Sequence, residues 1–151
     1  MIDYIEPSMR GIMIIHGTQA QEYEGSYRQF FNEWLLQQLS TLDGRQDALK
    51  RLTQFARNVP VVIDASHCFY FTHCARTLQW RAINYFAVET LRPVSEETCR
   101  VTFHSGASVV IPRRLSALIR RHKRIERMFS LFSQMNVKAF LIKESVFQSG
   151  E

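Results

Sequence analysis

The sequence predicts an α+β fold in a single domain, residues 1–151, with a mainly antiparallel sheet. Three observations support this prediction. Residues 27–57 repeat apolar side chains at helical spacing, and short β-branched and aromatic runs follow Pro60. A long helix with one basic face then follows the last predicted hairpin. No Gly-, Ser- or Pro-rich linker divides the 151 residues, so one domain is expected.

The N-terminal part is predicted to contain one strand and two helices. Residues 10–16 form an apolar, β-branched run that is typical of a buried strand. Residues 27–39 predict a helix, and Ser26 is placed to cap its first turn. Residues 41–44 interrupt the helical periodicity, and a second helix is predicted over residues 45–57.

Strands dominate the sequence after Pro60. The clearest hairpin joins residues 100–104 to residues 107–111 at the turn Ser105-Gly106, because apolar and polar residues alternate on both arms. The other predicted strands are residues 61–64, 68–72 and the longer segment 80–90.

The most basic segment of the chain comes directly after Pro112. Residues 113–127 carry seven basic side chains against Glu126 alone, a local charge of +6 in a chain whose total is +5. The wider segment 113–135 contains no Gly or Pro and predicts one amphipathic helix. Its basic face is expected to be exposed, to cover about half the circumference and to be centred near Arg124. The basic residues are Arg113, Arg114, Arg120, Arg121, Lys123, Arg124 and Arg127.

This basic face indicates a surface for polyanions. Ordinary solvated faces mix charges of both signs, whereas like charges four residues apart, such as Arg120 and Arg124, cost a few tenths of a kcal/mol (about 0.2–0.5). Arginine predominates among the cations, which favours planar contacts to phosphate. The opposite, apolar face is needed for the core and has no Trp, so a membrane-surface helix is the weaker interpretation. The predicted apolar residues are Leu115, Leu118, Ile119, Ile125, Phe129 and Phe132.

Other chemistry has little support in the sequence. No Gly-rich phosphate loop, G-x-S-x-G or H-E-x-x-H motif occurs, so we predict neither an enzyme nor a cofactor. Two His-Cys pairs, at residues 67–68 and 73–74, suggest a zinc or thiol sensor. On one strand these pairs would lie ~20 Å apart, too far for one metal, although a turn between them would allow the site. Asp64, at a strand end, is expected to serve in a turn.

The sequence also predicts where the protein resides. No apolar run approaches the ~18 residues that a membrane-spanning helix needs. The N-terminus lacks the basic and apolar regions of a secretory signal. Three cysteines, an odd number, fit a reducing compartment. We therefore expect a cytoplasmic protein without a membrane partner.

Several sequence blocks follow the order and spacing of a known family. They are residues 40–45, which end in Gly44-Arg45, residues 60–64 (PVVID), the aromatic stretch 69–72, the lone Trp80, and residues 101–112 with the pattern VTF-x-x-G. In the basic helix, Leu118 and Arg124 match an apolar and an Arg position. Residues 40–126 thereby resemble the ComK family of competence transcription factors from Gram-positive bacteria. The chain departs from the family pattern at Phe71, Arg114 and Arg121, where Pro, Ser and Gln are usual.

The resemblance implies a transcriptional activator of competence (DNA-uptake) genes that binds AT-rich double-stranded DNA, chiefly through the minor groove. It also implies homodimers or tetramers on paired half-sites, and capture by an adaptor of a Clp-type protease. In the residue-based interpretation, the basic helix supplies the phosphate contacts. The alternative is a ComK-like protein-interaction module that binds no DNA and docks an acidic partner on the same face.

Overall fold

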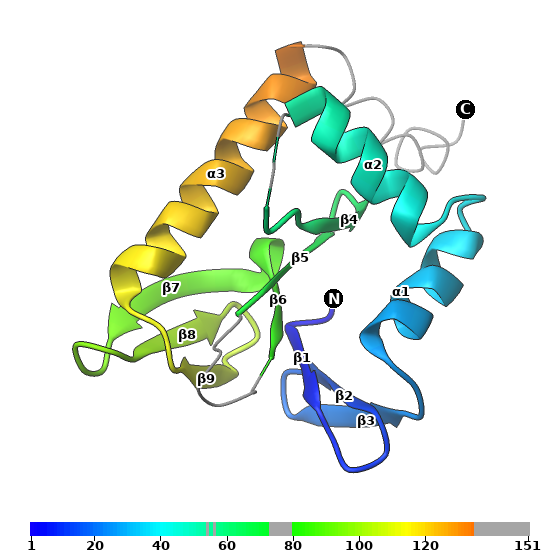
Figure 1. Cartoon of the computed structure of the whole chain (residues 1–151). Helices are drawn as coiled ribbons and strands as arrows, with labels where there is room; N and C mark the ends of the chain where they lie inside the picture. Colours follow the sequence, from blue (N-terminus) through cyan, green and yellow to red (C-terminus); the bar gives the residue numbers. More distant parts are fainter. Residues whose placement is uncertain (54, 56, 73–79, 135–151) are drawn as a thin grey trace, which may run out of the picture.

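Three α-helices and two antiparallel sheets make up the part of the chain that the structure describes, which confirms the predicted α+β class (Figure 1). The structure is a computed structural model, and it describes residues 1–53, 55, 57–72 and 80–134. Within those ranges, no helix combines the length and the apolar composition needed to cross a membrane.

Strands from two separate parts of the chain form the larger sheet, in the order β3-β2-β1-β6-β5-β4. Three of the strands lie within two residues of predicted ones. The short strand β1 and the edge strand β3 lie outside the predicted strands, and β3 has four exposed residues, so it lacks the apolar alternation that marks a half-buried strand. The six strands are β1 (Tyr4–Pro7), β2 (Ile12–His16), β3 (Gln19–Tyr23), β4 (Val61–Asp64), β5 (His67–Phe71) and β6 (Ala82–Asn84).

The smaller sheet contains the predicted hairpin, which is confirmed. Its order is β7-β8-β9, and its strands are β7 (Val88–Pro93), β8 (Cys99–Phe103) and β9 (Ser108–Ile111). Gly106 adopts a φ of +94° in the hairpin turn, a conformation that favours glycine. The neighbouring Ser105 hydroxyl donates a hydrogen bond to Oδ2 of Asp3 at 2.6 Å. The turn is therefore tied to the start of the chain.

The predicted single strand over residues 80–90 is wrong, because the chain changes sheets at Asn84. After β6 it forms the short 3-10 helix η1 (Tyr85–Ala87) and then enters the smaller sheet as β7. Asn84 is fully buried, and its side chain both donates and accepts hydrogen bonds at this corner. One polar side chain thus satisfies four backbone groups, which hydrophobic periodicity does not reveal. The partners are the N–H groups of Cys68 and Phe86 and the carbonyls of Ile2 and Ser66.

The predicted cap of the first helix is confirmed. Ser26 Oγ accepts a hydrogen bond from the N–H of Gln29 at 3.1 Å, and Oε1 of Gln29 accepts one from the N–H of Ser26 at 2.8 Å. This capping box starts α1 (Tyr27–Leu36). The helix ends at Leu36 rather than at residue 39, and Leu39 adopts a left-handed φ of 57°, which is typical of a helix C-terminus.

The second helix, α2 (Leu42–Thr53), begins and ends earlier than its predicted span of 45–57. Oγ1 of Thr41 accepts a hydrogen bond from the N–H of Gly44 at 3.0 Å, which caps the helix. Residues 41–44 were expected to be a break, but residues 42–44 form the first turn of α2. The interruption between the two helices lies instead at residues 37–41.

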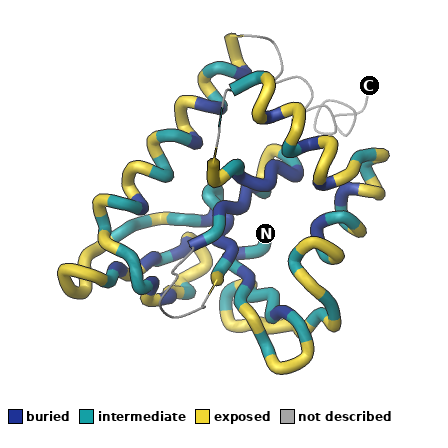
Figure 2. Tube along the Cα trace, viewed as in Figure 1, coloured by how far each residue is buried: buried dark blue, intermediate teal, exposed yellow. Residues whose placement is uncertain are grey.

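The larger sheet lies between two apolar layers, because successive side chains point to opposite faces. On β4, Val61 and Ile63 join a core with α1, whereas Val62 joins a core with the smaller sheet and α3 (Leu115–Gln134). Figure 2 shows buried residues concentrated on the central strands. The core on the α3 side therefore holds the basic helix in place, and its α3 members are Leu118, Ile125, Met128 and Phe132.

Candidate nucleic-acid interface

The helix α3 packs through a stripe of side chains at spacings of three and four residues. Its buried members are the four named above, and they contact the larger and smaller sheets within one core. The observed helix starts two residues later than the predicted span of 113–135, so Arg113 and Arg114 precede it. Residue 135 lies outside the described residues.

Three cations occupy the solvent side of α3. Arg120, Lys123 and Arg127 are exposed, and they are three and four residues apart along the helix. Because an α-helix rises about 1.5 Å per residue, the line from Arg120 to Arg127 is about 10 Å long. Glu126 is exposed one residue before Arg127, and it is the one acidic residue within 113–127. We call Arg120, Lys123 and Arg127 the cationic line.

The predicted centre of the basic face, Arg124, is wrong. The buried stripe runs through Ile125, and successive residues turn by about 100°, so Arg124 lies at the border of the buried stripe. The exposed face is centred near Lys123 instead. Ile119, expected in the core, is 37% exposed, whereas Met128 is buried although it was not expected there. The helix is therefore rolled about its axis relative to the sequence prediction.

The two remaining arginines of α3 have packed surroundings. Arg121 is half-buried, and burial, followed by the nearby charge of Arg113, lowers the pKa of its guanidinium. The Arg124 guanidinium carbon lies 4.3 Å from the centroid of the Phe55 ring, a cation–π contact. Arg124 and Arg127 also line a small depression of about 200 Å³ beside that ring. Arg121 and Arg124 thus contribute charge to the patch while they also stabilise packing.

The N-terminal end of α3 is joined to the smaller sheet by an ion pair. Nη2 of Arg114 lies 2.6 Å from Oε1 of Glu97, in the turn between β7 and β8. Both side chains are more than half exposed, so solvent screens the pair and its contribution to stability is small. It nevertheless positions the first arginines of the segment beside the turn and offsets part of their charge.

A buried polar contact fixes the roll of α3. Nε2 of His122 and the hydroxyl of Tyr70 are hydrogen-bonded at 2.7 Å, and the two rings meet edge to face. The ring of Tyr85 lies 5.0 Å from that of His122. Burial lowers the pKa of His122 to about 4, so the imidazole is neutral at pH 7. A neutral histidine therefore lies on the packed side of a helix whose other side is cationic.

Acidification should weaken the fold through His122. Its pKa is lower in the folded state than the ordinary value near 6.5, so as the pH falls the unfolded state binds the proton first. The free energy of unfolding should decrease from about pH 6.5 downward and level off near pH 4, by roughly 3 kcal/mol at most. Urea unfolding at pH 7 and pH 4.5 measures this loss. His122→Gln should show a smaller loss between the same two pH values, and an equal loss would contradict the assignment.

The chain was compared with models of known protein families. The model of the ComK protein family matches residues 6–136, most of the chain. The chain belongs to the ComK family. The match includes the strands β2 and β3 and the helix α1, which precede the sequence blocks of the resemblance. No curated protein and no solved structure gives a significant match.

Membership of the ComK family implies the general role of a competence transcription factor. The family consists of transcription factors rather than enzymes, which agrees with the absence of catalytic motifs from the sequence. The family match thus bears out the resemblance stated for residues 40–126.

Two of the four residues of the candidate metal or thiol site, His67 and Cys68, lie in the part of the chain that the structure describes. His67 and Cys68 lie on opposite faces of β5: His67 contacts the Trp34 ring, whereas Cys68 is fully buried in the core on the α3 side. Nδ1 of His67 is 3.0 Å from Oδ1 of Asp64, which also accepts the N–H of Ser66, so Asp64 has its expected turn role. No cluster of three potential metal ligands occurs in the described ranges. His73 and Cys74 lie outside them.

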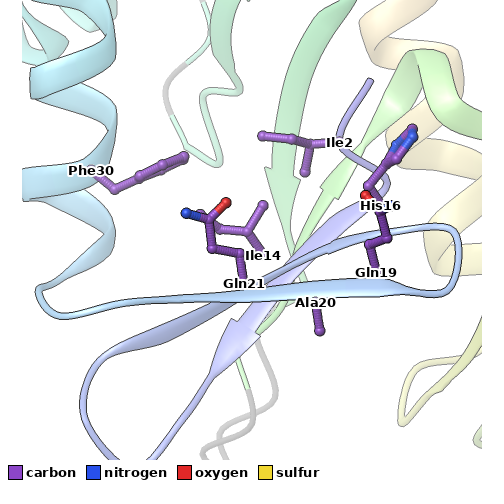
Figure 3. A pocket seen from close by; sticks show the side chains of 7 residues that line it. All are labelled: Ile2, Ile14, His16, Gln19, Ala20, Gln21 and Phe30. Carbon is purple, nitrogen blue, oxygen red and sulfur yellow. The ribbon is translucent and has the colours of Figure 1, made fainter.

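The open depression shown in Figure 3 lies on the face of the larger sheet that is opposite to α3. It measures about 610 Å³ and lies between α1 and the hairpin of β2 and β3. Ile14, Gln21 and Phe30 point into this space (Figure 3). No Lys, Arg, Asp or Glu lines it, so it differs in kind from the cationic line. The lining residues are Ile2, Ile14, His16, Gln19, Ala20, Gln21 and Phe30.

Sequence reasoning missed residues that hold the interface in position. Arg45 is buried against β4, and Asn84 forms the corner between the sheets. The block ending in Gly44-Arg45 gave a signal for Arg45, but only as part of a family pattern. Tyr70 and His122 are 52 residues apart, so no local pattern could pair them.

Proposed function

We propose that this ComK-family protein activates competence genes by binding AT-rich double-stranded DNA through α3. The observation that carries the proposal is the cationic line, Arg120, Lys123 and Arg127, on the exposed side of the helix. Exposed cations at this spacing neutralise phosphates and release counterions, which gives affinity that depends on salt. The charge is local: residues 113–127 carry a net charge of +6, whereas the whole chain carries +5, so the remaining residues sum to −1.

The seven basic residues have different roles in this proposal. The cationic line contacts phosphates directly. Arg113 and Arg114 extend the contact at the start of the helix, and Arg121 and Arg124 raise the positive potential from its border. Arginine inserted into the narrow minor groove of an AT-rich duplex would give shape readout, because that groove has enhanced negative potential.

The wider expectations from the family belong to the same proposal. Two copies related by a two-fold axis would read a palindromic site, as a dimer or as part of a tetramer. We propose a cytoplasmic location, where the chain reaches both promoter DNA and the adaptor of a Clp-type protease. The 1–151 chain would act as one DNA-binding domain.

The proposal is tested by comparing an AT-rich duplex with a GC-rich duplex of equal length by fluorescence anisotropy at 0.1 M salt. We expect the AT-rich duplex to bind at least about tenfold more tightly, a difference of about 1.4 kcal/mol. Equal affinity would contradict minor-groove shape readout. Absence of any binding to both duplexes, together with recovery of an acidic protein partner, would favour the protein-interaction module instead.

A further inference from the structure

The outer face of the smaller sheet is a second basic surface, separate from α3. Side chains alternate along β7, β8 and β9, so one row points into the core and the next points out. The inner rows include the buried residues Cys99, Val101, Phe103, Val109 and Ile111. The register places two outer rows across the three strands, namely Arg92, Arg100 and Val110, and Thr90, Thr102 and Ser108.

Two arginines lie directly opposite each other on this face. Arg92 pairs with Arg100 in the register of β7 and β8, and both side chains are exposed. Like charges in directly opposed positions destabilise a sheet. Nη1 of Arg100 lies 3.4 Å from Oγ of Ser108, so this arginine extends along the face toward β9. The pair thus holds two positive charges together where the fold gains nothing from their proximity.

Glu89, at the bulge of β7, is the one acidic residue on these three strands, and it forms no ion pair with either arginine. The two outer rows contain arginine, threonine, serine and valine, and neither Arg92 nor Arg100 forms an ion pair with a described residue. Elsewhere on the described surface, Arg10 pairs with Glu24 and Arg28 pairs with Asp43. Guanidinium and hydroxyl groups are the side-chain donors that contact DNA phosphates. The chemistry of the outer rows therefore complements a phosphate backbone.

One end of this sheet lies beside the start of the basic segment. The turn between β7 and β8 holds Glu97, which binds Arg114 at the start of the basic segment. Arg114, which directly precedes α3, therefore lies at the rim of the smaller sheet.

We infer that the outer face of the smaller sheet is a second contact surface for DNA phosphates, with Arg92 and Arg100 as its charged residues. Thr90, Thr102 and Ser108 supply hydroxyl donors beside them. This inference rests on the proposed function, because it assigns a further surface for the same ligand.

The test compares two double variants that lose the same net charge. Arg92→Gln with Arg100→Gln removes the sheet charges, and Arg10→Gln with Arg28→Gln removes two exposed charges near β2 and α1. Anisotropy with an AT-rich duplex is measured from 50 to 300 mM salt. Since each phosphate contact contributes about 0.9 to the slope of log K against log salt, the sheet variant should lose about 2 from the slope, and its affinity at 0.1 M salt should fall roughly 50-fold. The control variant should change little.

The results separate the inference from the proposed function. A wild-type protein that binds DNA, with a sheet variant that matches the control in slope and affinity, overturns the inference and leaves the proposed function intact. Equal losses in both variants also overturn it, because they would reflect net charge alone. If the wild-type protein binds no duplex, both the inference and the proposed function are contradicted. Circular dichroism and urea unfolding establish that the sheet variant is folded, as expected for exposed positions.

Discussion

Replacing Arg45 by alanine should lower the free energy of unfolding by about 3–5 kcal/mol. Arg45 is buried, and its Nη1 donates to the carbonyls of Val62 and Ile63 at 2.8 and 2.7 Å. Its Nη2 donates to Oε1 of Gln38 at 2.7 Å. Alanine would leave these acceptors without their donor in a region closed to water, and each such loss costs about 1–3 kcal/mol.

The position of the two carbonyls explains why an arginine is needed. A β-bulge interrupts the pairing of β4 with β5 between Val62 and Asp64, and β4 is an edge strand of the larger sheet. The guanidinium reaches both carbonyls from α2 and covers this irregular edge. Lysine would keep the charge but lacks the planar fork, so Arg45→Lys should recover only part of the loss.

Chemical denaturation of both variants measures this effect, with Lys50→Ala as the control. Lys50 is an exposed residue of the same helix, so its replacement should change stability by less than about 0.5 kcal/mol. A result in which Arg45→Ala is as stable as Lys50→Ala would contradict the role of Arg45 as a clamp between α2 and β4.

Replacing Arg120 and Arg127 together by glutamine should weaken binding to an AT-rich duplex by roughly 50-fold at 0.1 M salt. Both residues are exposed members of the cationic line, so the variant should fold normally. Two lost phosphate contacts should also reduce the slope of log K against log salt by about 2. Glutamine is chosen because it keeps helix propensity close to that of arginine.

Two comparisons make this result specific. The variant with Arg10→Gln and Arg28→Gln carries the same net charge and should bind almost as tightly as the wild-type protein. Arg121→Gln should lower both stability and affinity, because Arg121 is half-buried as well as basic. If the Arg120 and Arg127 variant bound DNA like the control variant, α3 would not be the contact surface.

Local sequence patterns predicted the elements that short-range interactions determine. The hairpin of β8 and β9 was predicted from the alternation of apolar and polar residues and from a turn that contains glycine. The capping role of Ser26 was predicted from the preference of serine for helix N-caps. The basic segment follows from composition alone. Helix ends were less predictable: Leu39 and Thr41 set the boundary between α1 and α2 by backbone conformation and capping.

Features that depend on distant partners could not be predicted in this way. The contact between His122 and Tyr70 fixes the roll of α3, and it joins residues far apart in the sequence. Helical periodicity alone therefore placed Arg121 on the exposed face, whereas it is half-buried in the structure. The corner at Asn84 depends on backbone groups from three other segments. Arg92 and Arg100 became neighbours only through the register of two strands in the smaller sheet.

The salt dependence of DNA binding by the unmodified protein tests the central claim most directly. Affinity for an AT-rich duplex is measured from 50 to 300 mM salt. If the three residues of the cationic line contact phosphates, log K should fall with log salt with a slope of about −3 or steeper. No binding at 50 mM salt, or an affinity indifferent to salt, would contradict a DNA interface on α3.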